Sequence, residues 1–136
     1  ATCDPMVRSW RAGSRITRPQ DVVHEPTGPA EAILRGDPTH TYPHLHDMVY
    51  QSGGTFESVT DAQIYEAQKM VLELEGIDGC PASATTVAAI KKMVAAGELR
   101  RDDVIFANLT GGLRTTEVTP QQYETLSKKE LLQDAA

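Results

Sequence analysis

The predicted fold is decided by residues 104–112, which read VIFANLTGG. Residues 104–110 form a predicted strand that is apolar on both faces. Such a strand belongs inside a parallel sheet that is covered by helices on both sides. Gly111 and Gly112 then allow positive φ angles and a close approach to the backbone. The stretch therefore indicates an α/β fold with a potential ligand site where this strand ends.

Two amphipathic helices are predicted before this strand. Thr60-Asp61 offers an N-cap for a helix over residues 62–75, and Gly76 ends that helix. A second helix is predicted over residues 81–96. The apolar stripe of the first helix consists of Ile64, Ala67, Val71 and Leu74, and that of the second consists of Ala84, Val87, Ile90 and Val94, widened by Ala88 and Ala95.

Shorter elements are predicted in the rest of the chain. Helices are expected over residues 5–12, 27–36, 43–51 and 120–134, and a short strand is expected over residues 55–59. The alternation of strands and helices is typical of a layered α/β domain. We therefore predict a single domain over residues 1–136, with a loop-rich segment at 1–41 and an α/β core with a C-terminal helix at 42–136.

The predicted sheet is incomplete. A fully buried strand needs a neighbour on each side, and three or more strands are normally needed for independent stability. Two short strands do not meet this requirement. We expect the missing strands to come from upstream chain, from a partner subunit or from a symmetry mate, so the domain is predicted to be only part of an α/β unit.

Composition and charge exclude several classes of function. The 136 residues are 40% hydrophobic and carry a net charge of -6, which lacks the basic footprint of a nucleic-acid-binding protein. No apolar run approaches the roughly 20 residues of a membrane span, and the first residues lack the pattern of a secretory signal. Cys3 and Cys80 are too few for a disulfide framework. A reduced cytoplasmic location is the expectation.

Two groups of charged or metal-binding residue types have competing interpretations. Four arginines lie three or four residues apart near the start of the chain: Arg8, Arg11, Arg15 and Arg18. Several of them would either lie on a solvated helix face or contact an anionic group or another polypeptide. His40, His44, His46 and Asp47 suggest a metal, but they lack the ligand spacing of a structural zinc site. No metal is predicted.

Two segments are candidates for chemistry. Residues 108–112 follow the buried strand, and ligands of open parallel sheets bind outside the carboxyl ends of strands. Thr110 would place a hydroxyl there, although a plain glycine turn is the alternative. Residues 75–84 join a glycine-rich connection to a helix start, which suits anions. Ser83 is either a ligand contact or a cap of a packed helix.

The order of these segments carries a resemblance to a known family. The succession of EGI at 75–77, PASA at 81–84, a helix, an apolar strand and LTGG at 109–112 resembles the C-terminal portion of tryptophan synthase β-like, or fold type II, pyridoxal-phosphate enzymes. Within that family, threonine synthase and cysteate synthase are the most similar group. Residues 26–38 and 52–59 also resemble that group, so the resemblance covers about residues 26–114.

The resemblance implies a site and an activity. The cofactor would be pyridoxal 5'-phosphate, and the fold would be the C-terminal part of the large, three-layer α/β domain. Thr110 would meet the pyridine nitrogen, Gly111 and Gly112 would let the ring approach, and Ala82 and Ser83 would line the pocket. The reaction would be the β- or γ-elimination or replacement of an amino acid by a lyase or synthase, in the manner of threonine synthase.

The chain departs from the family pattern in one important respect. The family's Schiff-base lysine and its glycine-rich phosphate loop have no counterpart here, because the lysines lie in helical segments where a surface role is expected; they are Lys69, Lys91, Lys92, Lys128 and Lys129. We therefore expect a missing segment or a partner to supply the lysine, and the chain alone to be inactive. The whole enzyme is expected to form a homo-oligomer. The alternative is a non-catalytic interaction protein that pairs with a full-length homologue.

Overall fold

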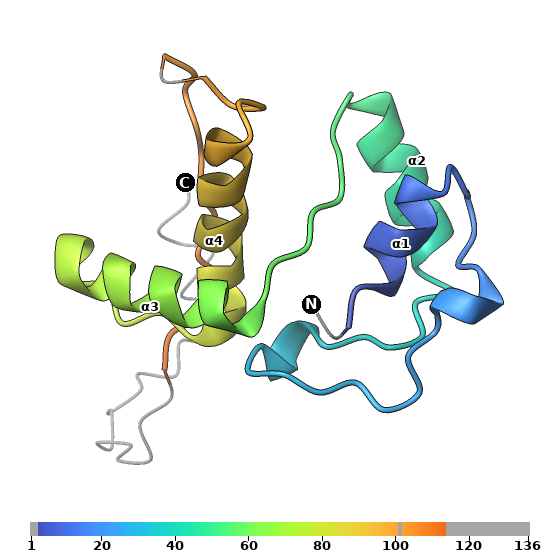
Figure 1. Cartoon of the computed structure of the whole chain (residues 1–136), viewed down its shortest axis with the longest axis horizontal. Helices are drawn as coiled ribbons and strands as arrows, with labels where there is room; N and C mark the ends of the chain where they lie inside the picture. Colours follow the sequence, from blue (N-terminus) through green and yellow to red (C-terminus); the bar gives the residue numbers. More distant parts are fainter. Residues whose placement is uncertain (1–2, 101, 114–136) are drawn as a thin grey trace, which may run out of the picture.

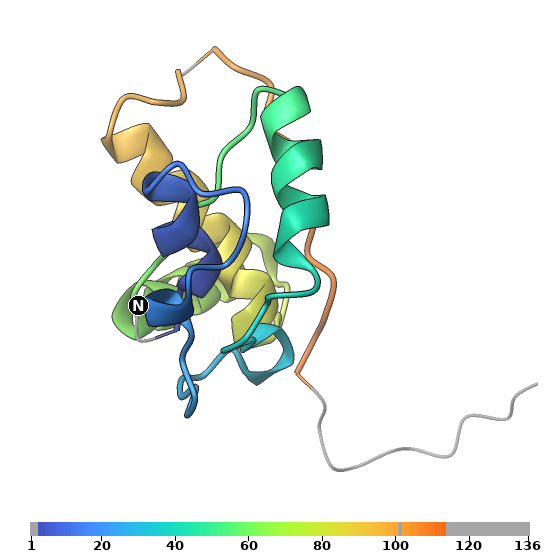
Figure 2. The same cartoon turned by 90° about the vertical axis from the view of Figure 1, so that its right-hand side faces the viewer.

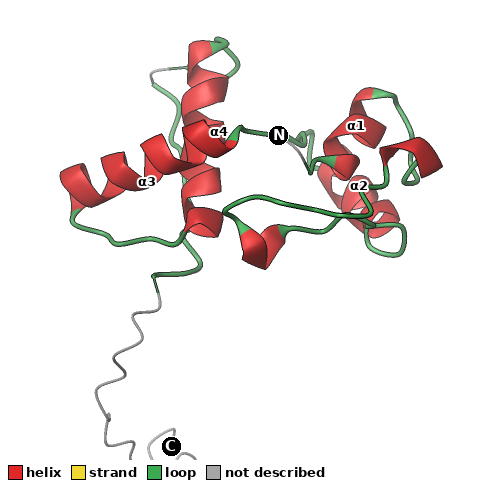
Figure 3. Cartoon of the chain, turned by 60° about the horizontal axis from the view of Figure 1, so that its bottom comes forward, coloured by secondary structure: helices red, strands yellow, loops and turns green. Residues whose placement is uncertain are grey.

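A computed structural model describes residues 3–100 and 102–113 of the chain. Within these ranges the regular elements are helical, and no strand is formed (Figure 3). In chain order they are α1 (Pro5–Arg11), the 3-10 turns η1 (Pro19–Asp21) and η2 (Glu31–Ile33), α2 (Tyr42–Gln51), α3 (Asp61–Glu75) and α4 (Pro81–Ala95). As described, the chain is therefore a helical assembly, and the α/β layering expected from sequence is not present in it.

The helices form two lobes. In Figure 1, α1 and α2 lie on one side of the molecule and α3 and α4 on the other, joined by the linker of residues 52–60. Seen at right angles in Figure 2, α1 and α2 remain neighbours. No helix among the described residues has the length and apolar character needed to cross a membrane.

Helix α3 begins and ends as the sequence predicts. The Thr60 hydroxyl accepts the backbone N–H of Gln63 at 3.3 Å, and the Gln63 side chain accepts the N–H of Thr60 at 2.8 Å. This is a capping box, which satisfies two donors at the helix start. Gly76 ends the helix with a φ of 68°, in the left-handed region that favours glycine.

The core of the second lobe is built from small side chains. Its buried members come from α3, α4 and the two segments that pack on them: Ala30, Val59, Ile64, Ala67, Ala84 and Ala88. Alanines at the crossing let α3 and α4 approach closely, which agrees with most of the predicted stripes. The prediction is wrong for Leu74, which is 73% exposed because the end of α3 projects beyond α4 (Figure 1). It is also wrong for Val94 and Ala95, which are exposed in the last turn of α4.

The first lobe is held by aromatic side chains. Tyr42 is fully buried at the start of α2, and its hydroxyl donates to the Ser14 carbonyl at 2.8 Å. Phe56, from the linker, contacts the rings of both Trp10 and Tyr42. His46 packs on the rings of Trp10 and Tyr42 and so belongs to a small aromatic core.

A carboxylate joins the two lobes. Glu57 in the linker accepts hydrogen bonds from Arg11 of α1 at 2.7 Å and from Lys92 of α4 at 2.9 Å. Burial works to raise the pKa of Glu57, but the bonds from Lys92 and the Ser58 N–H outweigh it and hold that pKa below its usual value. Lys92 also donates to the Ser58 carbonyl at 2.8 Å, so its predicted solvent-facing role is wrong.

Three predicted elements differ from the structure. The helix expected over residues 27–36 is reduced to the 3-10 turn η2, because Pro29 follows Gly28, whose φ of 147° is not helical. The strands expected over 55–59 and 104–110 are not formed. The helix expected over 120–134 lies outside the described residues. A strand needs a neighbouring strand to bond with, and these segments find none among the described residues.

The segment 104–110 keeps the pattern of a strand without its partners. It runs back along α4 toward the start of that helix (Figure 1). Val104 is fully exposed and Phe106 is 88% exposed, whereas Ile105 and Leu109, on the alternate face, are less exposed. In the described range its only ladder contact is one antiparallel bridge just beyond it, between Gly79 and Gly112. An apolar surface is therefore left open beside α4.

Candidate functional site

The structure brings the two segments that were predicted to carry chemistry into contact. Residues 78–83 and 110–113, which we call the glycine junction, bond to each other through their backbones. The Cys80 N–H donates to the Gly111 carbonyl, and the Leu113 N–H donates to the Asp78 carbonyl, both at 3.1 Å. The turn after the apolar segment is thereby fixed against the start of α4.

Ser83 is the side chain at the centre of the glycine junction. It lies in the first turn of α4 and is 2% exposed. Its hydroxyl donates to the Gly111 carbonyl at 2.7 Å and accepts the Gly111 N–H at 2.8 Å. One hydroxyl has one proton and two lone pairs, so most of its bonding capacity is used within the chain. Its expected contact with a cofactor stays a prediction.

The glycines are required here for space. A Cβ on Gly111 would lie 3.0 Å from the Cys80 sulfur and 3.6 Å from the Ser83 hydroxyl. A Cβ on Gly112 would lie 3.4 Å from the Asp78 carbonyl oxygen. Neither glycine has a positive φ, so that part of the prediction is wrong. The crowding comes from the chain's own Cys80, Ser83 and Asp78, and the approach of a cofactor ring to these glycines stays a prediction.

The remaining predicted site residues occupy different environments. Thr110 is exposed at the end of the apolar segment, where its hydroxyl is available to a ligand. Ala82 is half-buried and packs against the core of the second lobe. All five predicted residues therefore belong to one junction, in which Thr110 is exposed while Ser83 and Ala82 pack within the chain.

Two residues of this region were not predicted. Gln68 of α3 donates its side-chain N–H to the Gly79 carbonyl at 2.8 Å, which ties α3 to the glycine junction. Cys80 occupies the N-cap of α4, and its sulfur lies 3.5 Å from the Ser83 hydroxyl. The sequence does hold a signal for Cys80, because a residue directly before a proline that starts a helix is placed at the helix N-terminus.

The environment of Cys80 favours its thiolate. Hydrogen bonds from the Ser83 side chain and from backbone N–H groups of the first turn lower the pKa of Cys80, against a smaller effect of burial. The hydroxyl proton of Ser83 cannot serve both Cys80 and the much closer Gly111 carbonyl. The backbone N–H groups at the helix N-terminus are therefore the steadier source of the lowered pKa.

The two cysteines are expected to differ in reactivity. Both are free and half-buried, but burial and the neighbouring Asp4 raise the pKa of Cys3. Since the thiolate is the nucleophile, Cys80 should be alkylated by iodoacetamide roughly 3- to 10-fold faster than Cys3 near neutral pH. Time-resolved peptide mass spectrometry measures both rates in one sample, and faster labelling of Cys3 would contradict the assigned environments.

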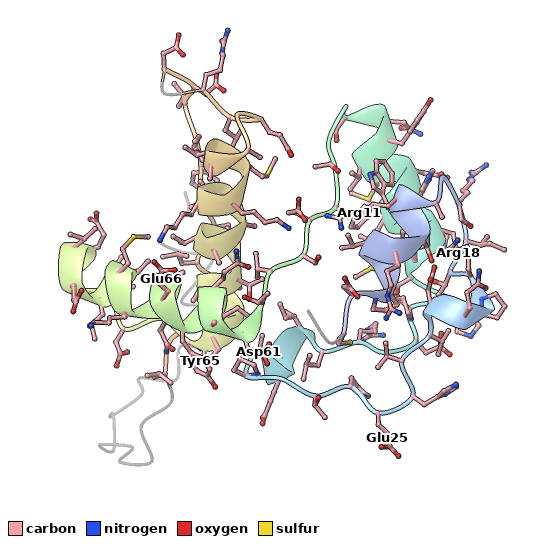
Figure 4. The ribbon with its side chains drawn as sticks, in the orientation of Figure 1. Arg11, Arg18, Glu25, Asp61, Tyr65 and Glu66 are labelled. Carbon is pink, nitrogen blue, oxygen red and sulfur yellow. The ribbon has the colours of Figure 1, made fainter. Side chains whose placement is uncertain are left out.

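The four arginines near the start of the chain bind carboxylates of the chain itself. The pairs, all within 3.0 Å, are Arg8–Asp4, Arg11–Glu57, Arg15–Asp47 and Arg18–Asp21 (Figure 4). Only Arg8 and Arg11 lie in α1, so the four do not form one helix face. The Arg18 guanidinium is the main reason that the pKa of the buried Asp21 is lowered. Arg11 and Arg15 are more than half exposed, and a contact of this group with an anionic group or another polypeptide stays a prediction.

The lysines of the described residues lie away from the glycine junction. Lys69 pairs with Glu73 along α3, and Lys91 of α4 pairs with Glu66 of α3 (Figure 4). Both lysines are at least half-exposed, as predicted. Lys128 and Lys129 lie outside the described residues. None of the described lysines therefore has the desolvated surroundings that activate a lysine amine.

A cavity of about 200 Å³ lies apart from the glycine junction. Its lining is mainly apolar and comes from the first turn of α1, from residues 27–35 and from the linker, including Val7, Leu34 and Phe56. Its volume is below the roughly 300 Å³ at which small-molecule pockets begin. We take the glycine junction as the candidate site because the two segments predicted to carry chemistry are hydrogen-bonded to each other there.

Comparison with known proteins identifies the family. A sequence model of the family described as "Pyridoxal-phosphate dependent enzyme" matches residues 1–111. Threonine synthase from Methanosarcina acetivorans is 38% identical over 109 residues, which cover 80% of this chain and 26% of that protein. Threonine synthase from Methanocaldococcus jannaschii is also 38% identical over 109 residues, covering 79% of this chain and 25% of that protein. Cysteate synthase from Methanosarcina mazei is 32% identical over 114 residues, which cover 79% of this chain and 27% of that protein.

The chain thus spans about a quarter of the length of these relatives. The resemblance to the threonine synthase and cysteate synthase group, which the sequence motifs indicated, is confirmed. With the family match extending over residues 1–111, the chain belongs to the family of pyridoxal-phosphate dependent enzymes.

Proposed function

We propose that this chain provides one wall of the cofactor pocket in a lyase or synthase that acts on an amino acid by β- or γ-elimination or replacement, in the manner of threonine synthase. The observation that carries the proposal is the glycine junction: an apolar strand-like segment delivers Thr110 and two closely packed glycines to the start of α4. Bound pyridoxal phosphate supplies the electron sink for such chemistry.

Thr110 is the residue of this chain that we assign to the cofactor ring. Its exposed hydroxyl is neutral, so it is able to donate a hydrogen bond to a pyridine nitrogen without giving up its proton. Gly111 and Gly112 bring no side chain of their own next to it; since Cys80 and Ser83 fill the space at the Gly111 Cβ position, a ring would approach from the opposite side. The chain's contribution would be to orient the ring and to exclude water from one side of it.

The rest of the site would come from outside this chain. The described lysines are engaged by carboxylates of the chain, Lys69 by Glu73, Lys91 by Glu66 and Lys92 by Glu57, and about three quarters of the length of the relatives has no counterpart here. We infer that this remainder supplies the cofactor-bearing lysine and the phosphate contacts. It would also supply parallel strands on both sides of residues 104–110, which would complete a three-layer domain and cover Val104 and Phe106.

A second candidate is a non-catalytic protein that pairs with a complete homologue. The open apolar surface of residues 104–109 supports it equally well, since a pairing surface needs no chemistry. The two candidates differ in what Thr110 does, because only the first requires its hydroxyl.

The experiment that tests the proposal is native mass spectrometry of the untagged protein from its source, after borohydride reduction to fix the cofactor on its lysine. A larger chain, or a complex of this chain with a larger partner, should carry the cofactor mass. A bare species of 14.8 kDa without partner or adduct would contradict the proposal and favour the pairing protein.

A further inference from the structure

Ser83 differs from Thr85, the next hydroxyl residue of α4, in where its hydrogen bonds go. Thr85 donates to the Pro81 carbonyl at 3.1 Å, one turn back in its own helix. Ser83 instead bonds Gly111, 28 residues away in sequence, as both donor and acceptor. A buried hydroxyl that bridges two segments in this way holds them in one relative position.

The two bonds differ in importance. The Gly111 carbonyl has a second donor, the Cys80 N–H at 3.1 Å, so it stays bonded without Ser83. The Gly111 N–H has the Ser83 hydroxyl, at 2.8 Å, as its acceptor. Gly111 is half-buried, so its N–H would bear part of the desolvation penalty of an unpaired donor if it lost this acceptor. The Gly111 amide is therefore the group through which Ser83 acts.

This amide is directly linked to the proposed cofactor residue. The peptide unit is planar and includes the Cα and carbonyl of Thr110 together with the N–H of Gly111. Holding the Gly111 N–H therefore fixes the peptide plane and the position of the Thr110 Cα in it, which is the atom from which the Thr110 side chain leaves the backbone. A change of a few tenths of an ångström here would be passed on to the Thr110 hydroxyl.

We infer that Ser83 is a positioning residue: it aims Thr110 by binding the Gly111 backbone, and does not itself bind the cofactor. The effect of Ser83 on the cofactor rests on the proposed function, whereas its hydrogen bonds to Gly111 do not. The positioning role revises the expectation that Ser83 lines the pocket as a polar contact. Under it, residues 81–84 and 110–112 keep one relative position because Ser83 joins them.

The first test measures the hydrogen bond to Gly111 in the chain without cofactor. Amide hydrogen exchange at Gly111, measured by NMR, should be roughly 10- to 100-fold faster in Ser83→Ala than in the native chain. Ser83→Thr keeps the hydroxyl and should restore protection. Thr85→Val, which removes a hydroxyl bonded only within α4, is the matched control and should leave Gly111 unchanged. Unchanged exchange in Ser83→Ala would overturn the inference.

A second arm uses the complete enzyme. Ser83→Ala should lower kcat roughly tenfold with a smaller change in KM, shift the emission of the bound cofactor, and be rescued by Ser83→Thr. Faster exchange at Gly111 without any change in emission or kcat, while Thr110→Val still impairs the enzyme, would overturn the positioning role and leave the proposed function standing. A native enzyme that holds no cofactor would contradict the proposed function and the positioning role together.

Discussion

Replacing Thr110 by valine in the complete enzyme should lower kcat about 10- to 100-fold, the range expected when one hydrogen bond to the reacting system is lost. Valine has nearly the shape of threonine, so the change removes the hydroxyl and leaves the volume. Thr110 is exposed and belongs to no buried cluster among the described residues, which means that folding should be little affected. Steady-state kinetics with cofactor absorbance measures both activity and loading.

Thr110→Ser is the matched control for this change. It keeps the hydroxyl at the same position on the backbone and should retain most of the activity. If the valine variant were as active as the serine variant, the hydroxyl would have no role at the ring, and the non-catalytic pairing protein would be the better account of this chain.

Gly36→Ala should destabilise the chain by about 3 kcal/mol, at the upper end of the range for inserting a group into packed structure. A Cβ at this position would lie 1.9 Å from the Val23 carbonyl oxygen, a backbone atom that cannot swing away. The same two residues are joined by a bond from the Val23 N–H to the Gly36 carbonyl at 2.9 Å, which would be lost as they separate. Urea denaturation monitored by circular dichroism measures the difference.

Gly13→Ala separates this clash from backbone strain. Gly13 has a φ of 67° and open space around its would-be Cβ, so alanine there meets strain alone. We expect a loss of roughly 1 kcal/mol. A Gly36→Ala variant no less stable than Gly13→Ala would show that the approach of residues 23 and 36 is not a fixed feature of the fold.

Local signals in the sequence predicted the helices well. The bounds of α3 follow from Thr60, Gln63 and Gly76, because a capping box and a left-handed glycine act through neighbouring atoms only. The start of α4 is likewise determined locally, by the proline at its first position, Pro81. By contrast, burial at the ends of α3 and α4 depends on how far along their lengths the two helices stay in contact. For this reason Leu74 and Val94 were predicted as buried but are exposed.

Features that depend on distant residues were harder to predict. The sequence identified residues 104–110 as a strand, but no other described segment pairs with it, so residues 3–100 and 102–113 hold an extended segment and no sheet. The contact between the PASA segment and the TGG turn was not predicted, because nothing local indicates that Ser83 bonds Gly111. The same holds for Glu57, whose partners Arg11 and Lys92 lie 46 and 35 residues away.

The pairing of residues 104–109 tests the central claim most directly. If these residues form an inner strand that the rest of the enzyme completes, their backbone amides should exchange rapidly in this chain alone. In the complete enzyme the exchange should be slowed by at least about 100-fold, as expected for a core strand. Hydrogen exchange with peptide mass spectrometry on both samples gives the comparison. Equal, rapid exchange in both would contradict the account, since it would leave Thr110 on an unsupported segment with no pocket to face.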